Sequence, residues 1–397
     1  MFWGSHYINR NEIFIYIEKF NKLGNYVLAD FVDSNEFGFF NQVTNMNYDY
    51  ENNPSMLEIL NYSQKQVREG TVYRVSFETI TTLIPQIQIV EDSLIIGFRI
   101  DLLPNGPELF GKPKSFSAEE RFWLNMDDTQ RDYLPNIDKV IVRNIGQGNW
   151  NELASDKKFV LIYDSGTIYS TKADIVKTIA GSRNIEYQKD KPVLILSHWD
   201  VDHYHFLTAF DDETIKSFCT FIYRASIPNL TARKVLGRFR KLNKDALCPL
   251  ACIDPSPKKS SSKLIGINLT INKNIILYNA SKNPSRNKSG IGLCIRKKNY
   301  CVILPGDFDY SQISDFILPD LAYACNHYLI VPHHGGKAGK FEYKTYSNNI
   351  LKEAVISVGK NPYNPPHPHA NNVINLKAKG FSVIRTDIID RDYIIKF

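Results

Sequence analysis

Histidine and aspartate residues gather in short windows of this sequence, and both are side chains that bind metal ions. Eight of the nine histidines lie within residues 198–205 and 327–369. The first window reads Ser197-His-Trp-Asp-Val-Asp-His-Tyr-His205 and holds the candidate ligands His198, Asp200, Asp202 and His203. Neutral imidazole and carboxylate suit zinc, and the additional carboxylates also suit manganese or iron. A tight turn in this window would point two pairs of ligands at two ions.

Three later windows carry the same residue types. They are Leu304-Pro-Gly-Asp307, Val331-Pro-His-His-Gly-Gly336 and His367-Pro-His369. A lone histidine pair is usually explained by packing, but four such windows in succession are difficult to explain that way. The sequence therefore predicts a centre of two divalent ions, zinc or manganese with magnesium as a further choice. Such a pair lowers the pKa of a bound water and can activate it for attack on phosphorus or on a carbonyl group.

Short apolar segments precede these windows and have the length of buried β-strands. Seven strands are expected, at residues 138–145, 158–164, 191–197, 300–305, 327–332, 353–359 and 381–386. The third to the sixth run directly into polar residues that could bind metal. This pattern predicts an α/β sandwich with its site at the strand ends.

The first 135 residues have a different pattern. Residues 71–80 and 93–103 alternate at period two and are expected to be strands, whereas 9–23 begin as a strand and then could turn helical. We predict a separate α+β domain over residues 1–135, to which the sequence assigns no role. A hydrolase domain is predicted over 136–397, with an insertion over about 206–285.

Composition excludes several classes of protein. The chain has 397 residues, of which 43% are hydrophobic and 23% charged, which excludes a mainly disordered or fibrous chain. No apolar run reaches the roughly 18 residues that a membrane span needs, and no secretory signal is visible, so we expect a cytoplasmic location. Six cysteines are too few for a disulfide scaffold at this length, and the C-x3-C pair at Cys248 and Cys252 is a weak metal signal.

Charge is unevenly distributed along the chain. Residues 1–135 have a net charge of −8, whereas residues 206–300 hold 18 Lys and Arg against 5 Asp and Glu. A basic block of this kind indicates either a polyanionic partner or a solvated, lysine-rich insertion. Within it, residues 233–242 are expected to form a helix that either lies along a phosphate backbone or covers the core. The loop 256–263 is a further candidate for phosphate contact.

The motifs together resemble the metallo-β-lactamase fold superfamily, most closely the metallo-β-lactamase domain of the competence protein ComEC. The matching segments are Asn144-Ile-Gly-Gln-Gly, Leu161-Ile-Tyr-Asp-Ser-Gly, the window 197–203, Pro305-Gly-Asp, Val331-Pro-His-His-Gly-Gly, the stretch from Ser357 to His369, and Arg385-Thr-Asp. The resemblance covers roughly residues 138–397 and implies an αββα sandwich that hosts many kinds of hydrolase.

The resemblance also implies a role for each matching residue. His198 and Asp200 would bind one ion, with Asp200 where most of the superfamily has a second histidine, and Asp202, His203 and His334 would bind the other. Asp307 would bridge both ions, and Asp164 would brace the ligand loop. Two departures concern the pocket around the centre: Asn149 replaces the usual aspartate after Gly-Gln-Gly, and two extra residues precede His367.

Further residues are candidates for the reaction and for binding the substrate. Asn287 lies where the common pattern has another histidine ligand. His205 is either a proton donor to the leaving group or a support for the ligand loop. The candidates for the catalytic step are Asp202, His333, His205 and His367, and those for substrate contact are Lys337, Arg233, Lys234, Arg238, Arg240, Asn287 and His369.

These observations favour a metal-dependent phosphodiesterase, most simply a nuclease acting on DNA or RNA. A regulated effector, for example in antiviral defence, would fit this two-part architecture, with the acidic first domain covering the basic block or recruiting a protein partner. The alternative is a hydrolase of a small molecule, namely a cyclic nucleotide, a phosphocholine ester or a lactam or lactone. A binding protein with a decayed site is a third hypothesis, against which the intact ligand set argues.

Overall fold

The chain forms two compact units. The computed structural model describes residues 11–46, 48–49, 53–64, 66–104, 106–114, 137–156, 158–252, 264–268, 274–283, 285–297, 299–321, 326–361 and 366–397. The first unit contains Met1–Ala118 and Pro228–Leu236, and the second contains Glu119–Ile227 and Gly237–Phe397. The expected boundary at residue 135 lies outside the described residues.

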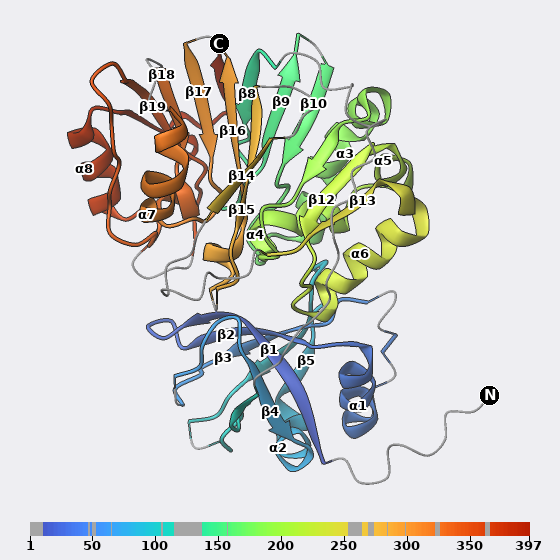
Figure 1. Ribbon diagram of the computed structural model, residues 1–397. Coiled ribbons are helices and arrows are strands. Elements are labelled where there is room, and N and C mark those ends of the chain that lie inside the picture. Colours follow the sequence, from blue (N-terminus) through green and yellow to red (C-terminus); the bar gives the residue numbers. More distant parts are fainter. Residues whose placement is uncertain are drawn as a thin grey trace. The chain divides into compact units, whose positions relative to one another are not determined.

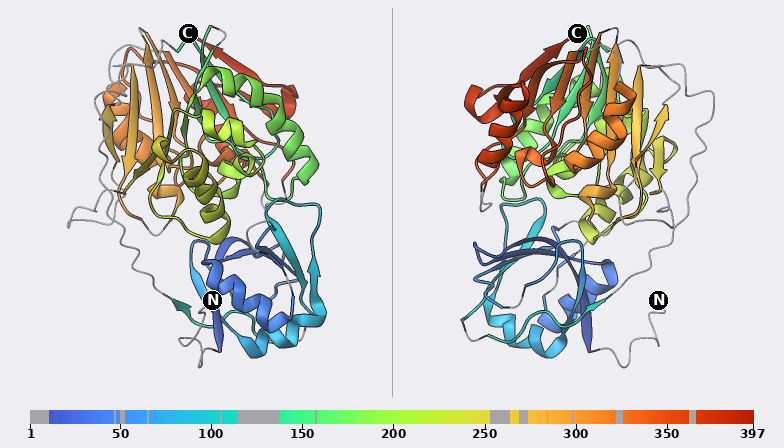
Figure 2. Two further views of the ribbon diagram at one scale, coloured as in Figure 1. Left: turned by 90° about the vertical axis from the view of Figure 1, so that its right-hand side faces the viewer. Right: turned by 60° about the vertical axis from the view of Figure 1, so that its left-hand side comes forward.

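Two seven-stranded sheets build the second unit (Figures 1 and 2). One has the order β13-β12-β11-β10-β9-β8-β21, and the other β14-β15-β16-β17-β18-β19-β20. The strands of the first of these sheets are β8 (Lys139–Val142), β9 (Asn151–Ser155), β10 (Lys158–Tyr163), β11 (Val193–Ile195), β12 (Thr220–Arg224), β13 (Leu247–Leu250) and β21 (Tyr393–Lys396). Those of the other are β14 (Leu264–Asn268), β15 (Ile275–Ala280), β16 (Ile291–Lys297), β17 (Tyr300–Leu304), β18 (Asn326–Ile330), β19 (Ile350–Ile356) and β20 (Ser382–Arg385).

A shared apolar core lies between the two sheets, and helices cover their outer faces. Leu161 and Ile195 of one sheet pack with Leu293 and Val355 of the other in a single buried cluster. The outer face of the first sheet is covered by α3 (Ala173–Asp190), and that of the other by α7 (Tyr310–Gln312), the short helices after it and α8 (Ala370–Lys379). The predicted architecture, an αββα sandwich with an additional α+β domain, is confirmed.

The first unit has one sheet with the order β5-β6-β3-β2-β1-β4-β7. Its elements are β1 (Glu12–Asn21), β2 (Tyr26–Phe31), α1 (Ser34–Thr44), β3 (Met56–Leu60), β4 (Val72–Ser76), α2 (Phe77–Leu83), β5 (Ile87–Ile89), β6 (Ile96–Asp101) and β7 (Pro113–Lys114). Residues 12–21 stay a strand throughout, because Ile13, Ile15 and Ile17 all enter the core. The strand expected over 71–80 ends early, because Ser76 caps a helix by accepting a hydrogen bond from Thr79 N–H (3.1 Å).

The segment 228–236 belongs to the first unit although it lies far along the chain. It includes the first half of α6 (Leu230–Leu242). Leu230 joins the core of the first unit, and Thr231 N–H donates to the buried carboxylate of Asp30 (2.8 Å). Val235, Leu236 and Phe239 are all buried, so the apolar face of this helix covers core.

Connecting helices and turns complete the second unit. They are α4 (Val201–Tyr204), α5 (Asp212–Ser217) and α9 (Thr386–Ile389), together with the short turns η5 (Asn287–Ser289) and η8 (Pro332–Gly335). Across the residues that the structure describes, every helix is too short or too polar to cross a bilayer.

Candidate metal centre

The four histidine and aspartate windows meet because they follow strands at one end of the sandwich. β11 leads into His198, and α4, which begins three residues later, carries Asp202 and His203. On the opposite sheet, β17 leads into Asp307, and β18 leads into the turn η8 with His334. The two sheets therefore each supply ligands to one centre.

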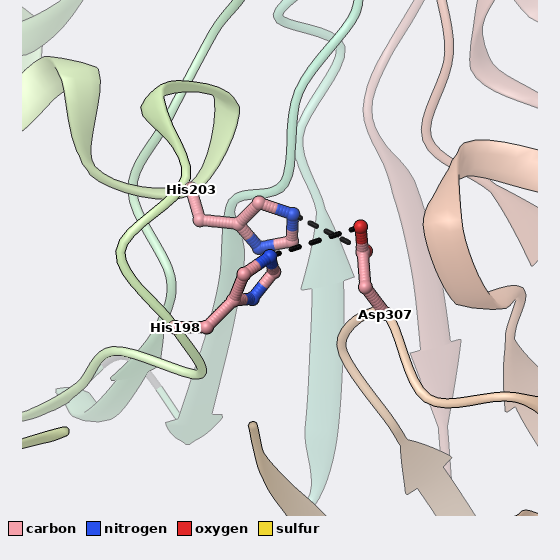
Figure 3. Close-up of side chains that lie close together, drawn as sticks. All are labelled: His198, His203 and Asp307. Carbon is pink, nitrogen blue, oxygen red and sulfur yellow. Dashed lines mark ion pairs between the residues drawn. The ribbon is translucent and has the colours of Figure 1, made fainter. Parts of the chain in front are cut away.

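Asp307 and His203 lie at the middle of this centre. Figure 3 shows the rings of His198 and His203 directed at the Asp307 carboxylate. His203 Nε2 is 3.2 Å from Asp307 Oδ1, and His198 Nε2 is 3.8 Å from Asp307 Oδ2. On the other side, His334 Nε2 is 3.5 Å from Asp202 Oδ2. These side chains form two overlapping groups of the kind that binds a metal, namely His198, His203 and Asp307, and Asp202, His203 and His334.

Hydrogen bonds fix the same orientation in each histidine ring. His203 Nδ1 donates to Asp164 Oδ2 (2.8 Å) and His334 Nδ1 donates to the Ser357 carbonyl (2.9 Å). His198 Nδ1 lies 3.0 Å from Ser197 Oγ, whose own hydrogen goes to Asp164 (2.8 Å). Because Nδ1 carries the proton, the Nε2 lone pair of a neutral ring faces the centre, which is the arrangement of metal-binding histidines.

Several buried atoms at the centre lack a partner within the protein. Among the described residues, Nε2 of His198, His203 and His334 and Oδ1 of Asp307 are buried with no hydrogen-bond partner. An unpaired buried polar atom is costly, and four that face one point are explained by an ion between them. The residues present therefore fit a bound divalent metal.

Asp164 organises the ligand loop from below. It is fully buried and accepts hydrogen bonds from Ser197 N–H (2.6 Å) and from Asn149 Nδ2 (2.8 Å), in addition to those from Ser197 Oγ and His203. Gly166 lies just after it, against the backbone of α4, where a Cβ atom would come within 2.3 Å of the carbonyl carbon of Asp202. Close packing of these two segments thus positions Asp202 and His203.

The environment keeps the aspartates ionised. Burial alone would raise the pKa of Asp202, but the nearby imidazoles of His334 and His203 bring it well below the ordinary value. The pKa of Asp307 is also lowered against the effect of burial, by His333 and His203. For Asp200, Arg286 and His198 outweigh burial and lower the pKa to about 2. Ionised carboxylates are the form that binds cations.

The position of Asp200 differs from that of the other carboxylates. Its Oδ2 is 3.5 Å from His198 Nε2, and its Oδ1 is 3.1 Å from Nε of Arg286. Asn287, which lies where the resemblance has a histidine ligand, donates through Nδ2 to Asp307 Oδ2 (3.2 Å).

The remaining histidines extend from the centre. His333 Nε2 is 3.7 Å from Asp307 Oδ2, and its Nδ1 donates to the carbonyl of Lys337 (3.0 Å). The ring of His367 lies 5.3 Å from those of both His333 and His369. His205 directly follows α4 and is buried. Desolvation lowers its pKa to about 4, and its Nδ1 donates to the Thr167 carbonyl (3.3 Å). The ring of His205 is therefore neutral at pH 7.

The basic candidates on α6 have different environments. Lys234 Nζ donates to the Asn53 carbonyl (2.6 Å) within the first unit. Arg238 pairs with Asp212 in the second unit (2.6 Å). Arg233 and Arg240 are exposed. Residues 256–263 lie outside the described residues.

Two features of the centre were not predicted from the sequence. One is Arg286, which could have been suspected because it directly precedes the candidate residue Asn287 in the sequence. The other is the hydrogen bonding of Ser197, which links His198 to Asp164 and sits inside the matched window.

No family model and no curated protein matches the chain. Among solved structures, zinc-bound PqqB from Methylobacterium extorquens has 11% identity and a TM-score of 0.34, over 63% of this chain and 87% of PqqB. Human tRNase Z, short form, has 11% identity and a TM-score of 0.33, over 65% of this chain and 98% of the tRNase. Similarity of this extent adds no argument about activity, so the function is inferred from the site itself.

Proposed function

We propose that this protein is a metal-dependent hydrolase that cleaves phosphodiester bonds, most simply those of DNA or RNA. The observation that carries the proposal is the convergence of three buried Nε2 atoms and Asp307 Oδ1, all without a partner among the described residues. Burying such a set of polar atoms costs free energy unless the atoms bind a cation. Zinc and manganese both suit imidazole together with carboxylate.

Each ligand has a defined place in this proposal. Asp202, His203 and His334 would hold one ion together with Asp307, and the resemblance places a second ion at His198 and Asp200. A bound ion supplies Lewis acidity and a water of lowered pKa. The protein's own contribution is to hold the ligands rigidly, because Asp164 and Ser357 fix the rings of His203 and His334 from behind.

Phosphorus is favoured over a carbonyl substrate by the charge around the centre. His333 lies 3.7 Å from Asp307 and would contact a phosphate oxygen, and the side chain of Lys337 is exposed nearby. The basic excess of residues 206–300 would attract a polyanion. In this proposal Arg233, Arg240 and His369 contact the substrate outside the centre. The relationship to the ComEC-like branch and a role in antiviral defence are part of the same hypothesis.

A small phosphoester is the second candidate substrate, and one observation favours it. Lys234 and Arg238, two of the five basic residues on α6, are already paired within the protein. Fewer basic side chains of the helix are therefore available to bind a nucleic-acid backbone than its composition implies. Cleavage that does not weaken with salt would support this candidate, because binding to a polymer of phosphates is strongly salt-dependent.

The test is cleavage of labelled single-stranded and duplex DNA and RNA with added Mn²⁺, Mg²⁺ or Zn²⁺. Wild type is compared with Asp202→Ala and with Asp174→Ala, an exposed aspartate on α3. Cleavage by wild type and Asp174→Ala, lost in Asp202→Ala, is the expected result. If metal-loaded wild type cleaves no nucleic acid but hydrolyses a small phosphodiester, the substrate class is the second candidate.

A further inference from the structure

Arg286 places a fixed positive charge beside the metal centre. It comes directly before the turn η5, and its Nε lies 3.1 Å from Asp200 Oδ1. Its Nη1 donates to the carbonyl of Trp199 (2.9 Å), the residue between His198 and Asp200. The side chain of Arg286 is only 18% exposed, so solvent screens its charge weakly.

The two ends of the centre are consequently unequal. At the His198 end, the carboxylate of Asp200 is already balanced by Arg286, and Asp307 Oδ2 accepts a hydrogen bond from Asn287 (3.2 Å). Asn287 also provides no imidazole at the position where the common pattern of the superfamily has a histidine ligand. Two ligand atoms at this end, His198 Nε2 and Asp200 Oδ1, are buried without a hydrogen-bond partner among the described residues, and Asp200 Oδ1 faces the Arg286 guanidinium at 3.1 Å.

The opposite end is the group of Asp202, His203 and His334, and Asp307 Oδ1 lies 3.2 Å from His203 Nε2. His203 Nε2, His334 Nε2 and Asp307 Oδ1 have no hydrogen-bond partner in the described part of the chain. Asp202 adds a carboxylate, with Oδ2 at 3.5 Å from His334 Nε2 and Oδ1 at 3.9 Å from His203 Nε2. Two carboxylates and two neutral imidazoles balance one divalent ion.

We propose that the centre binds one divalent ion per chain, at Asp202, His203, His334 and Asp307, and that Arg286 takes the place of a second ion. This inference rests on the proposed metal binding but not on the identity of the substrate. A guanidinium keeps its charge at every physiological pH and cannot be removed by a chelator. It would provide, from the protein itself, the second positive charge that stabilises a phosphorane-like transition state.

The experiment measures metal stoichiometry, so it does not depend on finding a substrate. Metal-free protein is titrated with Zn²⁺ or Mn²⁺ by calorimetry, and bound metal is counted by mass spectrometry after gel filtration. Wild type is compared with Arg286→Gln and with Arg296→Gln, an arginine on β16 whose Nη1 donates to the Asp320 carbonyl (3.4 Å). We expect one ion in wild type and in Arg296→Gln. In Arg286→Gln we expect a second ion, bound at least tenfold more tightly than any second ion in wild type.

Two aspartate variants locate the tight ion. Asp202→Asn should lose it, whereas Asp200→Asn should retain it. Two ions of similar affinity in wild type, a single ion in Arg286→Gln, or loss of the ion in Asp200→Asn would each overturn the inference. If wild type binds no metal at all, the proposed function fails together with this inference. The other outcomes leave metal binding in place and overturn only the inference.

Discussion

Replacing Asp164 by asparagine tests whether the ligand loop depends on one buried carboxylate. Asp164 accepts hydrogen bonds from the backbone and hydroxyl of Ser197, from Asn149 and from His203, all between 2.6 and 2.8 Å. Asparagine offers one acceptor oxygen, and its NH₂ group would face at least one of these donors. In Asp164, three of the donors bind Oδ2 and the Ser197 N–H binds Oδ1. The asparagine therefore loses least when its oxygen takes the position of Oδ2, and the Ser197 N–H is then left unpaired.

The expected loss of stability follows from this geometry. An unpaired buried donor costs about 1–3 kcal/mol, and the three remaining bonds lose the strength that an ionised acceptor gives. We expect a total of about 3–5 kcal/mol, which corresponds to a fall in Tm on the order of 10 °C for a unit of this size. Metal affinity should fall about 10–100-fold, because the ring of His203 is no longer fixed.

The assay follows thermal unfolding through the fluorescence of Trp150 and Trp199, which are both buried in the second unit. Calorimetric titration with Zn²⁺ gives the affinity. Asp174→Asn on α3 is the control, because Asp174 is exposed and its one hydrogen bond with a described residue is local, from Ile175 N–H (2.9 Å). A Tm for Asp164→Asn within about 2 °C of that control, with unchanged metal affinity, would refute the reasoning.

Three further predictions address other parts of the structure. Gly166→Ala should weaken Zn²⁺ binding in calorimetry at least tenfold, because its Cβ atom would overlap the backbone of Asp202 at 2.3 Å. Leu230→Ala should destabilise the first unit by about 2–5 kcal/mol, seen as faster hydrogen exchange in β1 and β2 with no change in β10 and β11. Burial raises the pKa of Glu152 to about 7, against the opposing charge of Arg143, so its protonated form favours folding. That stability is present below pH 4.5 and is lost as pH rises through 7, and the difference in Tm between wild type and Glu152→Gln, measured from pH 5 to 8, should follow this course.

The strands that carry the site could be predicted because their signal is local. The strands predicted over 158–164 and 300–305 come from short apolar runs, and the structure has strands over Lys158–Tyr163 and Tyr300–Leu304. The place of 228–236 could not be predicted, because it depends on contacts with distant residues, such as the hydrogen bond between Thr231 and Asp30, which lie 201 positions apart. Amphipathicity showed that one face of this helix packs on a core, but not which core.

Asn149 and Asn287 are the two asparagines at which the chain departs from the pattern it resembles, and they act in the same way. Each donates its side-chain amide to a buried carboxylate of the centre: Asn149 to Asp164 (2.8 Å) and Asn287 to Asp307 (3.2 Å). An aspartate at 149 would instead place two buried carboxylates side by side, which raises the pKa of one of them and weakens the brace on His203. A histidine at 287 would restore a ligand at the end of the centre where Arg286 already balances Asp200. Both amides thus orient a carboxylate without adding charge, which agrees with the proposal that one ion and Arg286 balance the charge of the centre.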